Sequence, residues 1–138
     1  TIPGLDGRKM SKSYGNQIPL FCDEATLKKL ISSIKTDSSL PTEPKSTPCA
    51  VFDFYKLFAS KEQVEAFAEK FAKGISWADA KKELFEVANN FLSPMREKYN
   101  YYMSHYDEVE KILEEGSKKA RVIAKETVVR ARKAVGLD

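Results

Sequence analysis

Apolar residues recur at helical spacing over most of the chain. After Asp23, apolar side chains stand at positions i, i+3, i+4 and i+7, a spacing that places them on one face of a helix. These residues are Leu27, Leu30, Ile31 and Ile34. The same spacing predicts four more helices, over residues 49–58, 61–73, 77–102 and 107–134. No segment after residue 22 alternates apolar and polar positions as a strand would, so we expect an all-α fold.

Polar residues that can cap helix N-termini precede three of these segments. A capping side chain accepts a hydrogen bond from one of the first backbone N–H groups, which have no partner inside the helix. The caps are Asp23, Ser60 with Gln63, and Ser76 with Asp79. Gly74 is placed to end the third helix. Pro94 predicts a kink in the fourth helix because it has no N–H to donate, and Gly116 leaves open whether the last helix breaks.

Two irregular segments lie outside this helical pattern. Residues 1–22 read as extended chain and loop. Residues 36–48 contain three prolines and many hydroxyl side chains, which predicts a connection and an internal boundary. The sequence leaves open whether residues 36–38 cap a helix end or contact a ligand. The expected architecture is a helical bundle of four or five helices, forming a domain over residues 23–138, preceded by an irregular loop arm at 1–22.

Composition narrows the classes of function. The 138 residues carry a formal net charge of +3, which permits an anionic partner without requiring one. No apolar run approaches the roughly 18 residues that cross a bilayer, so a membrane protein is not expected. Cys22 and Cys49 lack the CxxC spacing, and we expect reduced thiols in a cytoplasmic protein. His105 is the sole histidine, which argues against a histidine-based metal site or a catalytic triad.

The most distinctive stretch is the basic segment Gly-Arg-Lys-Met-Ser-Lys-Ser-Tyr-Gly-Asn at residues 7–16. Its pattern fits neither a packed strand nor an amphipathic helix. Glycines near both ends allow backbone conformations that a Cβ would forbid. Ammonium groups attract an anion, and hydroxyl and backbone N–H groups can orient the anion's oxygens. The residues therefore indicate either a phosphate-binding loop or a solvated basic connection.

Charge divides the last predicted helix into two parts. Residues 107–115 hold five acidic residues against one lysine, a net charge of −4, whereas residues 117–133 hold seven basic residues against one glutamate, a net charge of +6. Compensation of the helix dipole requires only the terminal turns. The cationic part could contact an RNA backbone, with Lys118, Lys119 and Arg121 as candidates, or it could be a solvated face.

Residues 9–13, Lys-Met-Ser-Lys-Ser, match the KMSKS signature of class I aminoacyl-tRNA synthetases at every position. Several members of that class also share the glycine before the signature and the Gly-Asn pair after it. Further segments resemble bacterial tryptophanyl-tRNA synthetases. These segments are residues 3–8, 36–38, 94–99, 115–124 and 134–137.

The resemblance implies activation of tryptophan by ATP, release of pyrophosphate and transfer of tryptophan to tRNA(Trp). In that family the signature loop closes over the ATP phosphates. The match therefore assigns catalysis to Lys12, assisted by Lys9, and ATP binding to Lys9, Met10, Ser11, Lys12 and Ser13. Mg²⁺ is expected to accompany ATP as part of the substrate, with no tightly bound cofactor. The parent enzyme is expected to be a homodimer, and the sequence leaves open whether the fragment is a monomer.

One departure from the family is the absence of its second signature, His-x-Gly-His. We therefore expect a C-terminal fragment that holds the loop and a helical anticodon-binding domain, while the Rossmann-type catalytic domain is missing. Such a fragment is expected to be inactive alone, with a mobile loop. The alternative is a free-standing helical RNA-binding module without catalysis. The sequence does not indicate which residues read the anticodon.

Overall fold

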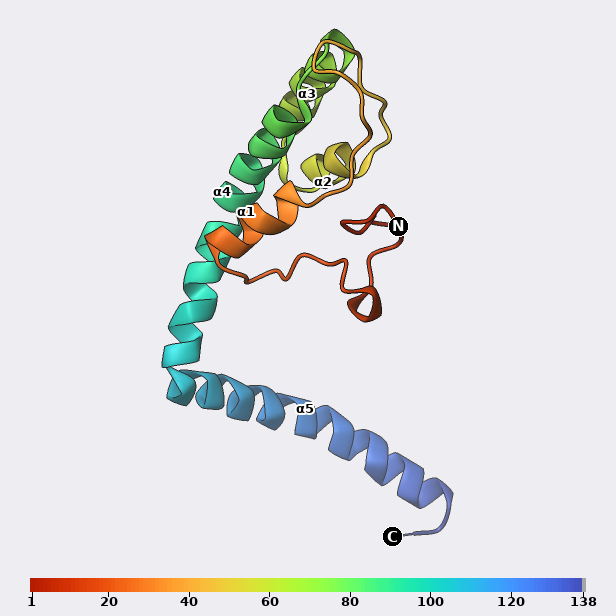
Figure 1. The fold of residues 1–138 in the computed structure, drawn as a ribbon. Helices are drawn as coiled ribbons and strands as arrows, with labels where there is room; N and C mark the ends of the chain where they lie inside the picture. Colours follow the sequence, from red (N-terminus) through yellow and green to blue (C-terminus); the bar gives the residue numbers. More distant parts are fainter. Residues whose placement is uncertain (138) are drawn as a thin grey trace. The chain divides into compact units, whose positions relative to one another are not determined.

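The computed structural model describes residues 1–137 and is helical (Figure 1). The α-helices are α1 (Glu24–Ser32), α2 (Ala50–Phe58), α3 (Lys61–Lys73), α4 (Trp77–Ser104) and α5 (Tyr106–Ala134), preceded by the 3₁₀ helix η1 (Lys12–Tyr14). Within residues 1–137 there is no strand, and the single bridge of β type joins Pro3 to Lys9. The prediction of an all-α fold is confirmed.

The predicted caps are present at the starts of three helices. The Asp23 carboxylate accepts a hydrogen bond of 2.8 Å from the Thr26 N–H. Ser60 and Gln63 form the complete capping box. The Ser76 hydroxyl accepts from the Asp79 N–H at 3.0 Å. Short-range chemistry therefore fixes where these helices begin.

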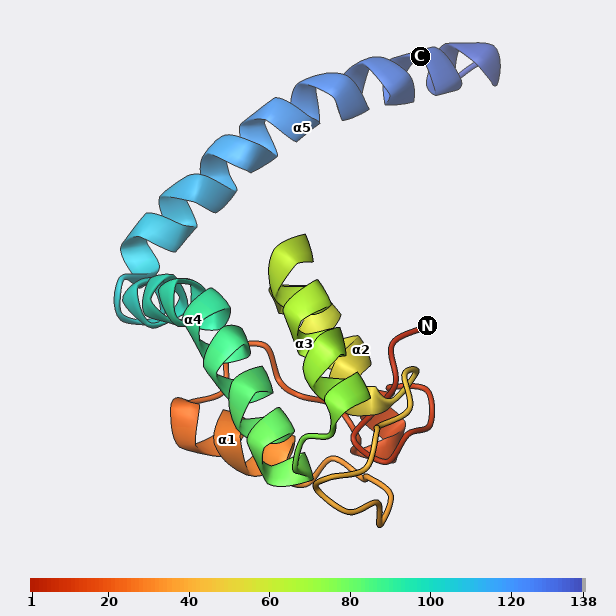
Figure 2. The ribbon, with the colours of Figure 1, turned by 90° about the horizontal axis from the view of Figure 1, so that it is seen from above.

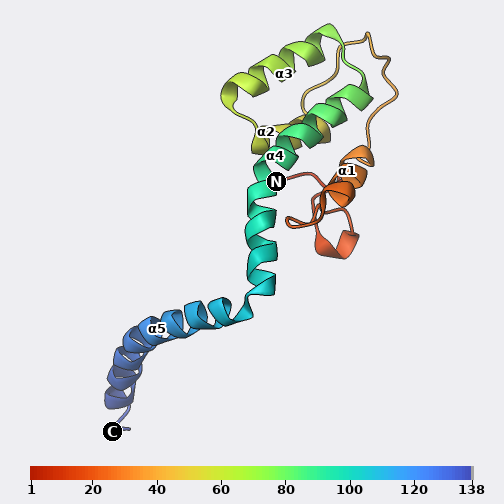
Figure 3. The same ribbon diagram turned by 90° about the vertical axis from the view of Figure 1, so that its left-hand side faces the viewer.

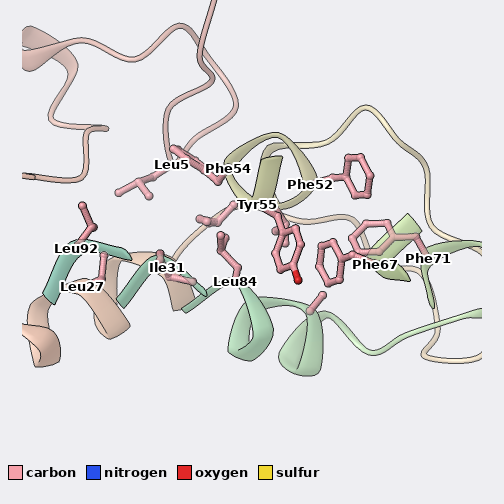
Figure 4. Packing of buried hydrophobic residues seen from close by; sticks show 14 residues of the cluster. Leu5, Leu27, Ile31, Phe52, Phe54, Tyr55, Phe67, Phe71, Leu84 and Leu92 are labelled. Carbon is pink, nitrogen blue, oxygen red and sulfur yellow. The ribbon is translucent and has the colours of Figure 1, made fainter. Parts of the chain in front are cut away.

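Contacts divide the chain into two compact units, residues 1–97 and 98–138. The first unit contains a hydrophobic core of 14 buried residues from α1 to α4, the segment after α1 and the arm (Figure 4). Leu5 of the arm belongs to this core and is 8% exposed. The arm and the segment 36–48 thus lie in the same compact unit as the first four helices. Assignment of residues 1–22 to a separate catalytic domain stays a prediction.

Side-chain contacts hold the helices of the first unit together. Figure 2 shows the ribbons of α3 and α4, and a salt bridge of 2.8 Å between Lys70 and Glu83 joins these two helices. α1 lies beside α4, where the Lys81 ammonium donates to the Ser32 carbonyl at 3.0 Å (Figure 3). Stacked aromatic rings of α2 and α3 fill the space between these helices, with ring centroids 3.9 Å apart for Tyr55 and Phe67.

Trp77 is a packing anchor at the start of α4. Its ring meets Phe71 edge-on at 5.8 Å. Its indole N–H donates to the Asp37 carboxylate at 3.0 Å, and that carboxylate also accepts from the Ser39 N–H at 2.9 Å. Asp37 therefore holds the segment after α1 against the start of α4, which gives this residue a structural role.

The last helix differs from the bundle helix that its apolar pattern predicts. α5 runs unbroken through Gly116, but it buries none of its residues and contributes none to the core. Most of its apolar residues, among them Ile112, Leu113 and Ile123, are exposed. The packed bundle therefore consists of α1 to α4. α4 likewise continues through Pro94. The predicted kink there stays a prediction.

Two further findings concern sulfur and membranes. Both Cys22 and Cys49 are free and partly buried, and burial raises the pKa of each thiol. Among the helices in residues 1–137, none combines the length and the apolarity that crossing a bilayer would demand.

Truncation of the core should destabilise the fold. Leu84 is fully buried, so Leu84→Ala leaves a cavity and should lower the free energy of unfolding by about 2–5 kcal/mol. The matched control is Leu113→Ala on α5, because Leu113 is 65% exposed and should change stability little. Urea unfolding followed by circular dichroism measures both. Equal losses in the two variants would contradict this description of the core.

Candidate functional site

The candidate site begins with a tight reversal of the arm. Besides the bridge between Pro3 and Lys9, the Met10 N–H donates to the Ile2 carbonyl at 3.1 Å. The chain turns back between these segments at Gly7, whose φ of +83° is favourable for glycine. The signature residues therefore begin on a segment whose backbone is hydrogen-bonded to residues 2 and 3.

The five signature residues occupy different environments. Met10 is partly buried against the hydrophobic core, whereas Lys9, Lys12 and Ser13 are exposed. The Ser11 and Ser13 hydroxyl oxygens lie 2.7 Å apart across the first residues of η1. The structure thus anchors the loop by its apolar residue and turns its cations to solvent.

A buried amide closes the loop. Asn16 is 4% exposed, and its side-chain nitrogen donates to the Asp6 carboxylate at 2.8 Å and to the Lys9 carbonyl at 3.1 Å. Its side-chain oxygen accepts from the Ser11 N–H at 2.8 Å. Sequence reasoning assigned no role to Asp6 or Asn16, because only the fold reveals this contact between residues ten positions apart.

The amide fits because Gly4 has no side chain. A Cβ on Gly4 would lie 2.2 Å from the side-chain nitrogen of Asn16 and 2.4 Å from its Cγ. The next residue, Leu5, donates its N–H to the Asn16 carbonyl at 2.9 Å. Both the backbone and the side chain of Asn16 are thus held against the first residues of the arm.

Asp6 is neutralised within the arm. Its carboxylate forms a salt bridge of 2.7 Å with Arg8, and the Arg8 guanidinium also lies 4.6 Å from the centre of the Tyr14 ring. The hydrogen bond from Asn16, followed by those from Arg8, lowers the pKa of Asp6 from 3.8 to about 2. Arg8 is therefore committed to Asp6 and Tyr14.

Lys9 and Lys12 remain as uncompensated cations. Neither ammonium group forms an ion pair or a side-chain hydrogen bond with the residues that the structure describes. Two positive charges three residues apart, with two hydroxyl groups between and beside them, can bind a phosphate group. The contacts of these residues with ATP stay a prediction.

The second candidate site lies on α5. Lys118, Lys119 and Arg121 are all exposed, and Lys118 and Arg121 lie three positions apart on one helix face. Up to residue 137, no basic side chain of residues 117–133 forms an ion pair. This cationic half of α5 could bind a polyanion, and its contact with RNA stays a prediction.

Comparison with known proteins decides the family. A family model described as tRNA synthetases class I (W and Y) matches residues 1–93. The chain belongs to this family. The match includes the signature loop and the whole hydrophobic core of α1 to α4.

Similar proteins lie in the tryptophan branch of the family. The tryptophan–tRNA ligase of Pseudomonas aeruginosa is 47% identical over 138 aligned positions, and the alignment covers 99% of this chain and 31% of that protein. The tryptophan–tRNA ligase of Xanthomonas campestris is 47% identical over 139 aligned positions, and the alignment covers 99% of this chain and 32% of that protein. The chain thus spans about a third of the length of the curated relatives it matches.

A solved structure agrees with these relatives. Tryptophanyl-tRNA synthetase from Campylobacter jejuni, complexed with ADP and tryptophan, matches with a TM-score of 0.89 at 38% identity. The match covers 99% of this chain and 43% of that one. The expected resemblance to bacterial tryptophanyl-tRNA synthetases is confirmed.

The titration of Asp6 tests the buried amide. Because the folded state lowers the pKa of Asp6, its carboxylate stabilises the fold fully above about pH 4 and loses this effect as the pH falls through about 2. An NMR titration of the Asp6 carboxyl carbon should have its midpoint near 2. Asn16→Ala should raise that midpoint toward 3.8, because the hydrogen bond from Asn16 is the largest cause of the lowered pKa of Asp6.

The control for this titration is Asn90→Ala, which removes an exposed amide of α4. It should leave the midpoint of Asp6 where it is. An unchanged midpoint in Asn16→Ala would show that Arg8 alone holds Asp6 ionised.

Proposed function

We propose that this chain is the part of a tryptophan–tRNA ligase that binds the ATP phosphates through residues 9–13 and tRNA(Trp) through its helices. The observation that carries the proposal is a pair of ammonium groups, Lys9 and Lys12, which have no ion-pair partner among residues 1–137 and lie on a loop whose backbone is tied to the core. Family membership supports the same function, because the match includes these residues.

The chemistry of activation explains why such a loop would be useful. A carboxylate oxygen of tryptophan attacks the α-phosphorus of ATP, the bond to the bridging oxygen breaks, and pyrophosphate leaves with Mg²⁺. Negative charge accumulates on the leaving phosphates in the transition state, where fixed positive charge stabilises it most. In this proposal Lys12 stabilises the leaving pyrophosphate and Lys9 assists it.

The remaining signature residues would position this charge. The hydroxyl groups of Ser11 and Ser13 can donate hydrogen bonds to phosphate oxygens. Met10, partly buried against the core, would hold the loop beside the nucleotide. ADP and tryptophan in the Campylobacter jejuni complex support an adenine nucleotide and tryptophan as ligands.

Removal of the Lys12 ammonium should slow activation in the full-length ligase. Lys12→Ala should reduce tryptophan-dependent pyrophosphate exchange about 100-fold or more, since the variant lacks a group that stabilises transition-state charge. The affinity for tRNA(Trp) should stay nearly the same. Lys61→Ala, which removes an exposed lysine of α3, is the control and should leave exchange unchanged. An unchanged exchange rate in Lys12→Ala would refute the role assigned to Lys12.

The second candidate function is RNA binding by the helices without catalysis. The uncompensated cations of residues 117–133 favour it. Simultaneous Lys118→Ala, Lys119→Ala and Arg121→Ala should weaken tRNA binding at low salt. The slope of log K against log salt should become shallower by about three, one for each phosphate that the variant no longer neutralises. Filter binding over a series of salt concentrations measures this slope.

A matched triple variant, Lys56→Ala, Lys61→Ala and Lys73→Ala, removes the same charge from α2 and α3. Similar weakening in both triple variants would indicate a diffuse effect of net charge and would reject residues 118–121 as a binding site for RNA. If RNA binding is retained while pyrophosphate exchange by the full-length ligase is absent, the non-catalytic function is the correct one.

A further inference from the structure

We infer that Asn16 is a positioning residue of the phosphate loop, which acts on ATP through Lys9 and Lys12 without touching it. The inference rests on the proposed function of these two lysines. Asn16 lies outside the five signature residues.

The Asn16 amide fixes both peptide groups that flank Met10. Its nitrogen donates to the Lys9 carbonyl at 3.1 Å, and its oxygen accepts from the Ser11 N–H at 2.8 Å. The first contact fixes the backbone from which the Lys9 side chain projects. The second fixes the residue immediately before Lys12. The Asn16 side chain thus holds the backbone from which Lys9 projects and the backbone next to Lys12.

Asp6 determines which way the amide faces. A carboxylate at this pKa only accepts hydrogen bonds, so it faces the nitrogen of Asn16, at 2.8 Å. The oxygen of the amide is then directed to the Ser11 N–H. The salt bridge with Arg8 holds Asp6 in place. The network therefore has an order: Arg8 orients Asp6, Asp6 orients Asn16, and Asn16 orients the loop.

Few other side chains could replace this amide. The site requires two donors and one acceptor within a short reach. Aspartate lacks the donors, and glutamine adds a methylene where Gly4 already approaches so closely that a Cβ would collide. Because Asn16 is 4% exposed, water cannot easily take the place of its hydrogen bonds. The same burial, with these three polar contacts, leaves the amide unavailable to a substrate.

A double-mutant cycle in the full-length ligase tests the inference. Asn16→Ala should lower kcat of pyrophosphate exchange about 10- to 100-fold, because misplacement of a catalytic group by about 1 Å has effects of this size. The KM for tryptophan should stay the same. In the Lys12→Ala background, Asn16→Ala should lower kcat by less than about threefold, because the main group that it positions is gone and only the assisting Lys9 is left. Asn90→Ala is the control and should change nothing.

Three outcomes have distinct meanings. Equal fold-losses from Asn16→Ala in both backgrounds would overturn the inference, since the effect would then not pass through Lys12. A lower melting temperature with unchanged kcat would also overturn it and leave Asn16 a purely structural role. If Lys12→Ala itself leaves exchange unchanged, the proposed function of the loop fails first.

A second variant keeps the inference testable if Asn16→Ala does not fold. Gly4→Ala retains Asn16 but pushes against its amide. This variant should show the same kinetic pattern as Asn16→Ala, namely a lower kcat with an unchanged KM for tryptophan. In the Lys12→Ala background its effect on kcat should likewise be smaller. Full activity of Gly4→Ala would contradict the fixed placement of the amide.

Discussion

The placement of the signature loop, residues 9–13, depends on Leu5, where the arm meets the helices. The Leu5 side chain is buried in the core. Its carbonyl accepts from the Lys35 N–H at 2.9 Å, and its N–H donates to the Asn16 carbonyl at 2.9 Å. One residue therefore joins the core, the segment after α1 and the exit of the loop. Because apolar burial and two backbone hydrogen bonds meet there, the loop's base takes its position from the helical core.

This base allows the loop to combine a restrained backbone with free cations. Arg8 is neutralised by Asp6, and the polar groups around Met10 are satisfied by Asn16. Lys9 and Lys12 are left without a partner among the described residues. A loop that used its lysines to hold itself together would have to break those contacts before it bound phosphate. Here Asp6, Arg8 and Asn16 hold the loop, so the charges of Lys9 and Lys12 would be available to an anion without local unfolding.

Sequence reasoning succeeds where the physical cause is local. Helical periodicity and the caps at Asp23, Ser60 and Ser76 follow from neighbours within a few positions, and the helices begin there. Asn16 could not be assigned in this way, because its burial depends on a glycine 12 positions earlier. For α5 the sequence pattern is clear, but it predicts packing that the structure of residues 1–137 does not show. Its apolar spacing is that of a packed helix, yet spacing does not specify what covers a face, and nothing within residues 1–137 buries it.

The two cationic sites would use charge in different ways. Two lysines on a tethered loop act at short range, where their positions decide how much transition-state charge they stabilise. The many cations of α5 lie on an exposed helix, where salt screens each charge and affinity comes from the sum of phosphate contacts. Salt should therefore weaken RNA binding steeply while it changes the activation step of bound substrates little. The buried amide belongs to the first kind of site, because a site that depends on position requires a side chain to fix it, whereas a site that depends on summed charge does not.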